Sequence, residues 1–403
     1  MAINTLKIRE DFPILQKRIG GKPLVYFDNA CMSLRPKQVL SAIQHYYEDL
    51  SACGGRSSHR LATQLTEEME RARKSVSAFF GAKRAEEIIF TKNTTEGINL
   101  VANSLALHKG DVVLTTDKEH NSNLLPWQFL AKRKGIVHEV VDSQKDNTFD
   151  IDRFERMMSK KVKLVAMVHT SNLDGTTIPA REICKIAHEH GALVLLDGAQ
   201  SAPHKNVDVR KIDCDFYAFS GHKMCGPSGI GGLYGKKEML EQLQPFLVGG
   251  ETVTDTTYTT YELEEIPHRF EAGLQHYAGI LGLGAAVEYL KKIGMANVEA
   301  QELLLNSAIT QGVEQLQLIG PVDPKLRGGI CNYLTGSIDP HALAIMLDQS
   351  ASIMVRSGAH CVHSWFNKHH LKGSLRASVS FYNTVDEAKF FVEQINKIVK
   401  NLK

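Results

Sequence analysis

Apolar residues in this chain follow two patterns: short, nearly continuous runs, and longer stretches in which they recur every three or four positions. Nearly continuous runs occupy 163–168, 192–196 and 216–219. Apolar runs of this length are typical of strands buried on both faces. Between 63 and 80, apolar residues recur at helical spacing among Glu, Arg and Lys, which predicts an amphipathic helix. Further strands and helices are expected at 23–27, 87–91, 98–107, 111–115, 124–134, 137–141 and 150–158.

This alternation of buried strands and amphipathic helices predicts an α/β fold whose sheet is largely parallel and covered on both faces. Beyond about residue 240 the pattern changes. The Thr- and Tyr-rich stretch 252–261 is expected to form a long exposed loop, and 269–273 is expected to open an apolar helix that ends near Leu290. Residues 297–403 are predicted to form a separate α/β unit of helix, strands and helix.

Composition narrows the class of function. The charges of the 47 basic and 45 acidic residues nearly cancel, so the net charge gives no attraction to nucleic acid or to an anionic membrane. Small-molecule chemistry is therefore expected. The seven cysteines are odd in number and lack CxxC spacing, which argues against a disulfide framework and a zinc site and favours a reducing compartment. No stretch approaches the roughly 20 apolar residues of a spanning helix. We expect a soluble cytoplasmic protein with no membrane, metal or nucleic-acid partner.

Polar clusters follow three neighbouring strands of the predicted sheet. Asn172 lies after the first apolar run, Asp197 to Gln200 after the second, and Ser220 to Lys223 after the third. Open parallel sheets bind ligands at the carboxyl ends of their strands. These side chains are therefore expected to share one binding site.

Lys223 and Asp197 are the most informative of these residues. A lysine is rarely buried unless paired, but a lysine in Schiff-base linkage to a cofactor aldehyde carries no such penalty. The segment Ser220-Gly-His-Lys223, after an aromatic strand, resembles the cofactor lysine of fold-type I pyridoxal phosphate (PLP) enzymes. Asp197 could supply the anion that PLP requires beside its ring nitrogen, or could cap the next helix.

Weaker signals lie upstream. His120 could stack on a cofactor ring or simply end a strand. Thr94 and Thr95 lie in a turn between a strand and a helix, where free N–H groups and the positive helix end suit a phosphate, although many such turns serve packing alone.

A second chemical centre lies near the C-terminus, in Arg356-Ser-Gly-Ala-His-Cys361 and at Arg376. A cysteine beside an imidazole on a loop can act as a nucleophilic thiolate, although many cysteines are buried and inert. Arg376 lies between apolar residues, where a guanidinium requires a carboxylate partner: either a substrate or an internal salt bridge.

Taken together, these motifs resemble the group II cysteine desulfurase and selenocysteine lyase family, within the class V aminotransferase superfamily, nearly from end to end. The fifteen-residue spacing from Cys361 to Arg376, with no inserted loop, is the group II mark. The matching stretches are Tyr26–Ala30, Thr94–Ala102, Glu119-His120, Pro126–Gln128, Ser171-Asn172, Asp197–Gln200, Ser220–Lys223, Arg269–Gly273 and Arg356–Cys361.

The resemblance implies a fold-type I PLP-dependent transferase with a mainly parallel seven-stranded sheet. It further implies a large domain of residues 18–286 and a small domain of 1–17 with 287–403, which carries the Cys361 loop. Lys223 would hold PLP and act in catalysis with Cys361 and His120. The other residues implied to contact the cofactor are Asp197, Gln200, Thr94, Thr95, Ser220, His222 and Asn172, and those implied to contact the substrate are Arg376, Asn172, Arg356, Asn29 and Ala30.

The activity implied by the resemblance is removal of sulfur from L-cysteine, which leaves L-alanine and a persulfide on Cys361. The sulfur would pass to an acceptor protein, for iron–sulfur cluster assembly or other sulfur biosynthesis, and the enzyme would be a homodimer. Leu274 replaces a family threonine that contributes to the phosphate site of the partner subunit, so that contact is lost or passes to Gln275 or His276. Residues 362–366 differ from the usual residues after the cysteine, which leaves the substrate preference and the sulfur acceptor open. Alternatives are a selenocysteine lyase, an aminotransferase, a β-eliminase or a PLP-binding scaffold without activity.

Overall fold

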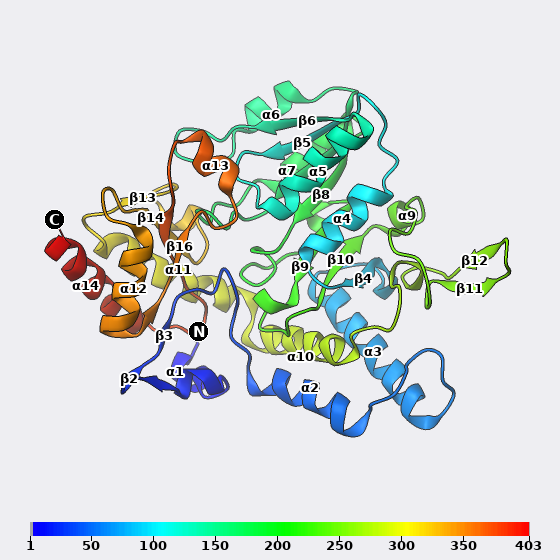
Figure 1. Ribbon diagram of the computed structural model, residues 1–403, viewed down its shortest axis with the longest axis horizontal. Helices are drawn as coiled ribbons and strands as arrows, with labels where there is room; N and C mark the ends of the chain where they lie inside the picture. Colours follow the sequence, from blue (N-terminus) through cyan, green and yellow to red (C-terminus); the bar gives the residue numbers. More distant parts are fainter. Residues whose placement is uncertain (1–2, 403) are drawn as a thin grey trace.

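The computed structural model describes residues 3–402 and contains one large sheet of seven strands (Figure 1). Strand β10 is antiparallel to both of its neighbours, and every other adjacent pair is parallel. The predicted α/β class with a mainly parallel seven-stranded sheet is therefore confirmed. In spatial order the strands are β4 (Ile88–Thr91), β10 (Gly231–Gly235), β9 (Phe216–Ser220), β8 (Leu193–Asp197), β7 (Val162–Val168), β5 (Val112–Thr116) and β6 (Val137–Val141).

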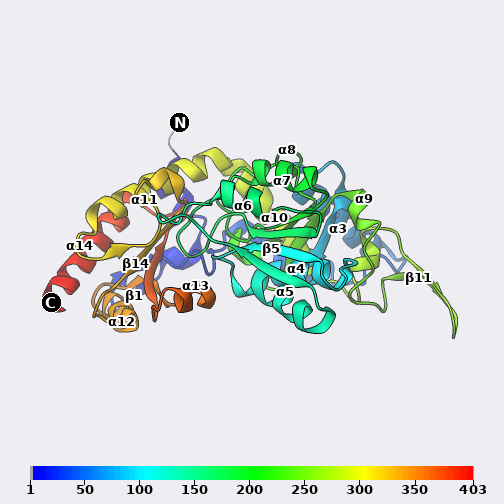
Figure 2. The same cartoon turned by 90° about the horizontal axis from the view of Figure 1, so that it is seen from above.

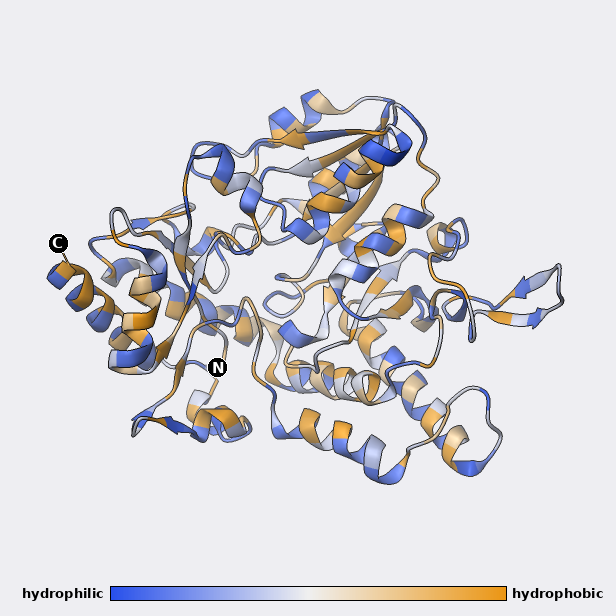
Figure 3. Cartoon of the chain, in the orientation of Figure 1, coloured by the Kyte–Doolittle hydropathy of each residue, from blue (hydrophilic) through white to orange (hydrophobic). Residues whose placement is uncertain are grey.

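Helices cover both faces of this sheet, as Figure 2 shows. Side chains alternate across a strand, so along β8 Val194 and Leu196 pack against the helices on one face of the sheet and Leu195 packs against those on the other. Most residues of the central strands are accordingly apolar (Figure 3), whereas the edge strand β6 includes His138 and Glu139. Helices α3 (Arg60–Phe79), α7 (Ala180–Glu189) and α10 (Tyr277–Ile293) form the first layer, and α4 (Thr94–Ser104) and α5 (Asn121–Lys134) form the second.

A smaller antiparallel sheet lies beside the large one (Figure 1). Its strands are β13 (Gln317–Leu318), β14 (Ile330–Leu334), β17 (Ser374–Ser378) and β16 (Arg356–Gly358), and it packs against α11 (Met295–Gly312), α12 (Pro340–Ala351) and α14 (Val385–Leu402). The remaining elements are α1 (Thr5–Arg9), β1 (Arg18–Ile19), β2 (Lys22–Pro23), β3 (Val25–Tyr26), α2 (Lys37–Asp49), α6 (Ile151–Met157), α8 (Val209–Ile212), α9 (Lys237–Leu240), β11 (Val253–Thr256), β12 (Tyr261–Leu263), β15 (Ile353–Met354), α13 (His363–Lys368) and the 3-10 turns Pro13–Gln16, Ala85–Glu87, Gly221–Lys223, His268–Phe270 and Pro324–Leu326.

Two features of the structure bear on the implied domain bounds. Strand β3 pairs with β15, so Val25 and Phe27 pack in the core of the smaller sheet rather than with the large one. Helix α10 runs through the implied boundary at residue 286 without a break. We propose that 25–27 belong to the small domain and that its C-terminal part begins at Gly294, where α10 has ended.

Three predicted elements differ from the structure. Residues 252–261 belong to an exposed antiparallel hairpin, β11 with β12, rather than a loop. Helix α4 begins at Thr94, four residues earlier than predicted, because the Asn93 side chain accepts a hydrogen bond from the Glu96 N–H and caps the helix. Helix α10 begins only at Tyr277, since Gly273 adopts a left-handed conformation (φ 75°) that a helix cannot contain.

The segment 269–273 is held by a buried ion pair. Arg73 Nη1 and Nη2 donate to the two Glu271 carboxylate oxygens at 2.7 and 2.9 Å, and both side chains are only 1% exposed. The same carboxylate accepts the Phe90 N–H at 2.7 Å and thereby ties the segment to β4.

Within residues 3–402, none of the helices combines the length and apolar content that crossing a membrane requires.

We predict that Glu271→Gln lowers the free energy of unfolding by about 3 kcal/mol, because the buried Arg73 charge then keeps only the partly exposed Glu70, 3.1 Å from Nε, as a counter-ion. The exposed pair Arg71–Glu67 provides the control: its side chains are 62% and 64% exposed, so Glu67→Gln is expected to cost less than about 1 kcal/mol. Urea denaturation midpoints measure both variants. Equal shifts in the two midpoints would contradict the prediction.

Candidate active site

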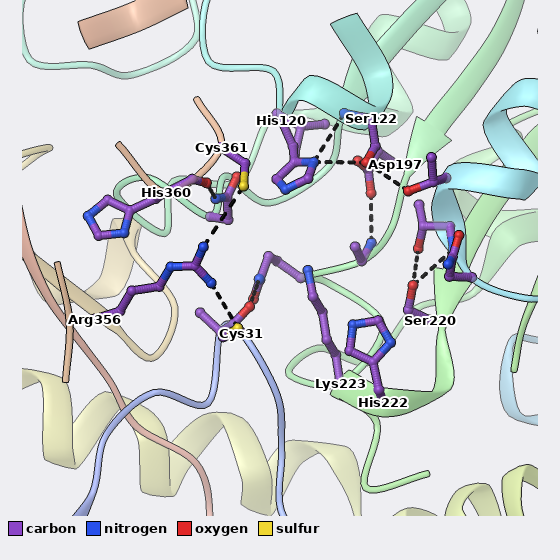
Figure 4. Close-up of a pocket in the computed structure, with 18 of the residues that line it drawn as sticks. Cys31, His120, Ser122, Asp197, Ser220, His222, Lys223, Arg356, His360 and Cys361 are labelled. Atoms are coloured by element: carbon purple, nitrogen blue, oxygen red, sulfur yellow. Dashed lines mark hydrogen bonds between the residues drawn. The ribbon is translucent and has the colours of Figure 1, made fainter. Parts of the chain in front are cut away.

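A cavity of about 210 Å³ lies at the carboxyl ends of β7, β8 and β9, where the large sheet meets the Cys361 loop (Figure 4). Parallel strands present their ends at one edge of the sheet, which brings the three polar clusters of the sequence together. Of the predicted site residues, those that line the cavity are Ala30, Thr94, Thr95, His120, Asn172, Asp197, Gln200, Ser220, His222, Lys223, Arg356, Cys361 and Arg376.

Lys223 reaches the cavity from a tight turn after β9. Gly221 makes this turn possible, because a Cβ there would come within 2.8 Å of the Ile230 carbonyl oxygen. Burial lowers the pKa of Lys223, although the charge of Asp197 partly opposes the shift. A lowered pKa raises the fraction of neutral amine, which is the form that attacks an aldehyde.

Asp197, at the end of β8, is 2% exposed. Its Oδ1 accepts the Ala199 N–H at 2.9 Å, so the carboxylate caps this turn and also faces the cavity. Burial raises its pKa, and both Lys223 and the Ala199 hydrogen bond oppose the shift. A cation in the cavity would further favour its charged form. No helix begins at this turn, so the alternative of a helix cap is wrong, and the contact with the cofactor stays a prediction.

His120 precedes α5 and caps it, since its Nδ1 accepts the Ser122 N–H at 3.1 Å. Burial, together with the charges of Lys223 and Arg376, lowers the pKa of His120 to about 3. The ring is therefore neutral near pH 7. A neutral ring that lines the cavity can contact a planar ligand without charge repulsion. The stacking of His120 on the cofactor ring stays a prediction.

The N-terminus of α4 lies at the opposite end of the cavity from Arg356 (Figure 4). Thr94 N–H donates to Ser220 Oγ at 2.9 Å, and the Thr95 and Ser122 hydroxyls lie 2.8 Å apart. Hydroxyl groups at the positive end of a helix form an environment that suits an anion. His222 also lines this cavity, and burial lowers its pKa to about 4.

Arg356 and Arg376 are directly opposite each other on β16 and β17, which places both guanidinium groups in the cavity. Arg376 Nη1 donates to the Asn172 carbonyl at 2.9 Å, and Nη2 lies 3.5 Å from Asp28 Oδ1. Burial lowers the pKa of Arg376 to about 10, although Asp28 opposes the shift. Arg376 Nε and Asn172 Oδ1 are buried without hydrogen-bond partners. The ion pair with Asp28 therefore leaves part of the guanidinium available to hydrogen-bond a ligand.

Cys361 lines the cavity from a constrained loop. Both His360 and Cys361 adopt left-handed backbone conformations (φ 51° and 60°), which non-glycine residues rarely do. The Asn121 N–H donates to the Cys361 carbonyl at 2.8 Å, and Asn172 Nδ2 donates to the His360 carbonyl at 2.8 Å. These bonds attach the loop to α5 and to the end of β7.

The residues after Cys361, where the sequence departs from the family, form the short helix α13. Val362, Trp365 and Phe366 from this segment are buried against Leu173 and Ile319. The departure therefore provides an apolar anchor that holds the cysteine loop over the cavity.

One predicted residue is not at the site. Asn29 does not line the cavity, because its side chain is engaged in the fold: Nδ2 donates to the Ser378 carbonyl at 2.7 Å, and Oδ1 accepts from the Tyr382 hydroxyl. Six lining residues lie outside the predicted set: Cys31, Asn93, Ser122, Val168, Ala199 and His360. All but Val168 lie within two residues of a predicted site residue, and this adjacency was the only available signal.

The cavity suits PLP. Gln200 Oε1 and Asn172 Oδ1 are buried polar atoms without partners, as expected where a ligand completes their hydrogen bonds. The site also offers an amine for an aldehyde, a carboxylate for a ring nitrogen, and hydroxyl groups at a helix end for a phosphate. Among residues 3–402, no three His, Cys, Asp or Glu side chains gather as metal ligands.

The comparisons with known proteins agree with this arrangement. Residues 25–391 match the family model "Aminotransferase class-V". A probable cysteine desulfurase from Synechocystis sp. is 42% identical over 98% of this chain and 95% of its own. The apo structure of a cysteine desulfurase from Thermococcus onnurineus NA1 superposes with a TM-score of 0.94 at 39% identity, covering 100% of this chain and 99% of that one.

A second similar structure carries the cofactor. It is a variant of C-DES with glycine covalently linked to PLP, and it has a TM-score of 0.82 and 25% identity, covering 96% of this chain and 98% of that one. The family model and the full-length relatives thus agree with the resemblance inferred from the motifs. The chain belongs to the class-V aminotransferase family, in the group of the cysteine desulfurases.

Proposed function

We propose that this protein is a PLP-dependent cysteine desulfurase, which converts L-cysteine to L-alanine and holds the released sulfur as a persulfide on Cys361. The observation that carries the proposal is one cavity lined by Lys223, Asp197 and Cys361 together with Arg376. A transaminase or a non-catalytic scaffold has no need of the cysteine in that position.

The residues of the chain divide the work. When bound, PLP supplies an electron sink for charge that develops on the substrate Cα. Lys223 Nζ would bond to the cofactor aldehyde, and Asp197 would pair with the ring nitrogen. Neutral His120 would contact the ring, and the N-terminal turn of α4, with Thr95 and Ser220, would hold the phosphate. The Lys223 amine would also move the proton of the substrate Cα.

Arg376 and Asn172 bind the substrate carboxylate, and the Cys361 thiolate attacks the substrate sulfur. Arg356 Nη2 lies 3.9 Å from Cys361 Sγ, where the guanidinium stabilises negative charge on the sulfur. The substrate Cβ–S bond breaks and a Cys361 S–S bond forms. Protonation of the resulting carbon then leads to alanine.

The test is to incubate the holoenzyme with L-cysteine and a dithiol reductant and to measure alanine, sulfide and pyruvate. We expect equal amounts of alanine and sulfide and no pyruvate. Pyruvate in place of alanine would indicate a β-eliminase, a requirement for a keto acid would indicate an aminotransferase, and turnover of selenocysteine alone would indicate a selenocysteine lyase. Each of these results would refute the proposal.

We predict that Arg376→Lys raises the KM for L-cysteine about 10- to 100-fold, because lysine cannot form the paired hydrogen bonds that a guanidinium offers a carboxylate. The yellow colour of bound PLP should persist. Arg153→Lys, in an exposed pair with Asp142, is the control and should leave KM unchanged. A wild-type KM in Arg376→Lys would remove Arg376 from the substrate site.

We also propose a cytoplasmic homodimer that passes sulfur to an acceptor protein. Support for the dimer comes from exposed apolar side chains that gather beside β4, among them Phe246, Leu247 and Leu274. Such clusters on a single chain mark interaction surfaces. The measurement is molecular mass by light scattering.

Support for a reducing compartment comes from the seven cysteines, all of which are free.

A further inference from the structure

A second cysteine, Cys31, lines the cavity and has no role in the mechanism above. Its Sγ lies 2.8 Å from Arg356 Nη1, while Cys361 Sγ lies 3.9 Å from Arg356 Nη2. In Figure 4 the guanidinium group lies between the two sulfur atoms. Two thiols from distant parts of the chain therefore share one cation.

The segment that carries Cys31 is held firmly. Ala30 N–H donates to Ser378 Oγ at 2.9 Å, the Cys31 N–H donates to the Asp28 carbonyl at 3.1 Å, and Gln200 Nε2 donates to the Ala30 carbonyl at 2.7 Å. The Cys361 loop is attached independently through Asn121 and Asn172. The hydrogen bonds of the two segments thus fix the position of the Cys31 sulfur relative to the Cys361 sulfur.

The other cysteines differ from this pair. Cys184, Cys214, Cys225 and Cys331 are buried, and burial raises the pKa of Cys184 to about 12. Cys53 is partly exposed but lies outside the cavity. Cys31 and Cys361 are the two cysteines, among the described residues, that are partly exposed and line the cavity.

A persulfide on Cys361 carries its outer sulfur about 2 Å beyond Sγ, the length of an S–S bond, and so extends the reach of the cysteine within the cavity. A thiolate attacks such a sulfur along the S–S bond and expels the other sulfur as a thiolate. Arg356 contacts both cysteine sulfurs, so the negative charge can move from one to the other beside the same cation.

We propose, on the basis of the desulfurase function proposed above, that Cys31 takes the outer sulfur from the Cys361 persulfide and so frees Cys361 for a second substrate. The Cys31 thiolate forms a bond to the outer sulfur, the Cys361 S–S bond breaks, and Cys361 leaves as a thiolate. The proton of the persulfide stays with the transferred sulfur. No oxidant or reductant is consumed, and one chain stores two sulfur atoms.

The experiment mixes holoenzyme with excess L-cysteine without reductant, alkylates the thiols and persulfides before unfolding, and maps the added sulfur on peptides by mass spectrometry. The alanine released in the initial burst is counted in the same samples. For the wild type we expect added sulfur first on Cys361 and then on Cys31, and a burst of about two alanines per chain. Cys31→Ser and Cys31→Ala should carry sulfur on Cys361 alone and release about one alanine per chain.

Two controls bound the interpretation. Cys53→Ser should reproduce the wild-type pattern, because Cys53 lies outside the cavity. Cys361→Ser should carry no sulfur on Cys31, since the relay starts from Cys361. The wild-type peptide map decides the question even if a Cys31 variant fails to fold.

Several results would overturn the relay: sulfur confined to Cys361 in the wild type, sulfur on Cys31 in Cys361→Ser, equal sulfur on Cys53, or a Cys31–Cys361 disulfide with release of hydrosulfide. The last would show attack on the inner sulfur. Absence of alanine and of sulfur on either cysteine would instead refute the desulfurase function itself. Failure of the relay alone leaves alanine and the Cys361 persulfide in place.

Discussion

Lys223→Ala is expected to abolish desulfuration, with turnover reduced more than about a thousandfold, because one side chain both attaches the cofactor and moves the substrate proton. No other lysine lines the cavity within residues 3–402. Purified Lys223→Ala should therefore lack the yellow colour of covalently held cofactor, and borohydride, which fixes the cofactor to the wild type, should attach none to the variant. Absorbance spectra and an alanine assay measure both effects.

Two further variants test whether the loss of activity comes from the missing amine. One keeps a positive charge at residue 223, and the other removes an exposed lysine elsewhere. Lys223→Arg keeps a cation but cannot bond to an aldehyde, so it should be as inactive as Lys223→Ala. Lys211→Ala, whose parent side chain is 83% exposed, should behave as the wild type. Normal colour and activity in Lys223→Ala would remove this residue from the site.

Cys361→Ser is expected to lower alanine production from L-cysteine more than about a hundredfold while it keeps bound PLP. A hydroxyl near neutral pH is a far poorer nucleophile toward sulfur than a thiolate. The variant should still bind L-cysteine through Arg376, so the cofactor spectrum should change on mixing and then stall. Stopped-flow absorbance and an alanine assay follow the two stages.

L-selenocysteine offers an internal control for this variant. Selenide leaves carbon more readily than sulfide and need not wait for the thiolate, so Cys361→Ser should retain turnover of L-selenocysteine. Cys53→Ser should match the wild type with both substrates. Full alanine production from L-cysteine by Cys361→Ser, without a stalled spectrum, would disprove the persulfide mechanism and favour a β-eliminase or a transaminase.

Much of the site could be predicted because its residues follow apolar strands. Asn172, Asp197 and Lys223 each lie just beyond a run whose period identifies a buried strand, and parallel strands end at one edge. Neighbouring residues determine this pattern, so it can be read from a single sequence. The motif around Cys361 was recognisable for the same reason, since its residues are close together in the chain.

The sequence by itself determined the class of fold, the order of the strands along the chain and the ends at which Lys223 and Asp197 lie. Only the tertiary structure decided that Asn29 is engaged in the fold, that 252–261 pairs as a hairpin, and that Arg356 lies between Cys31 and Cys361. Strand and helix patterns depend on neighbours in the chain, whereas these contacts depend on how distant segments pack. Nothing in the local order of residues specifies that a sulfur near the N-terminus meets a guanidinium 325 positions away.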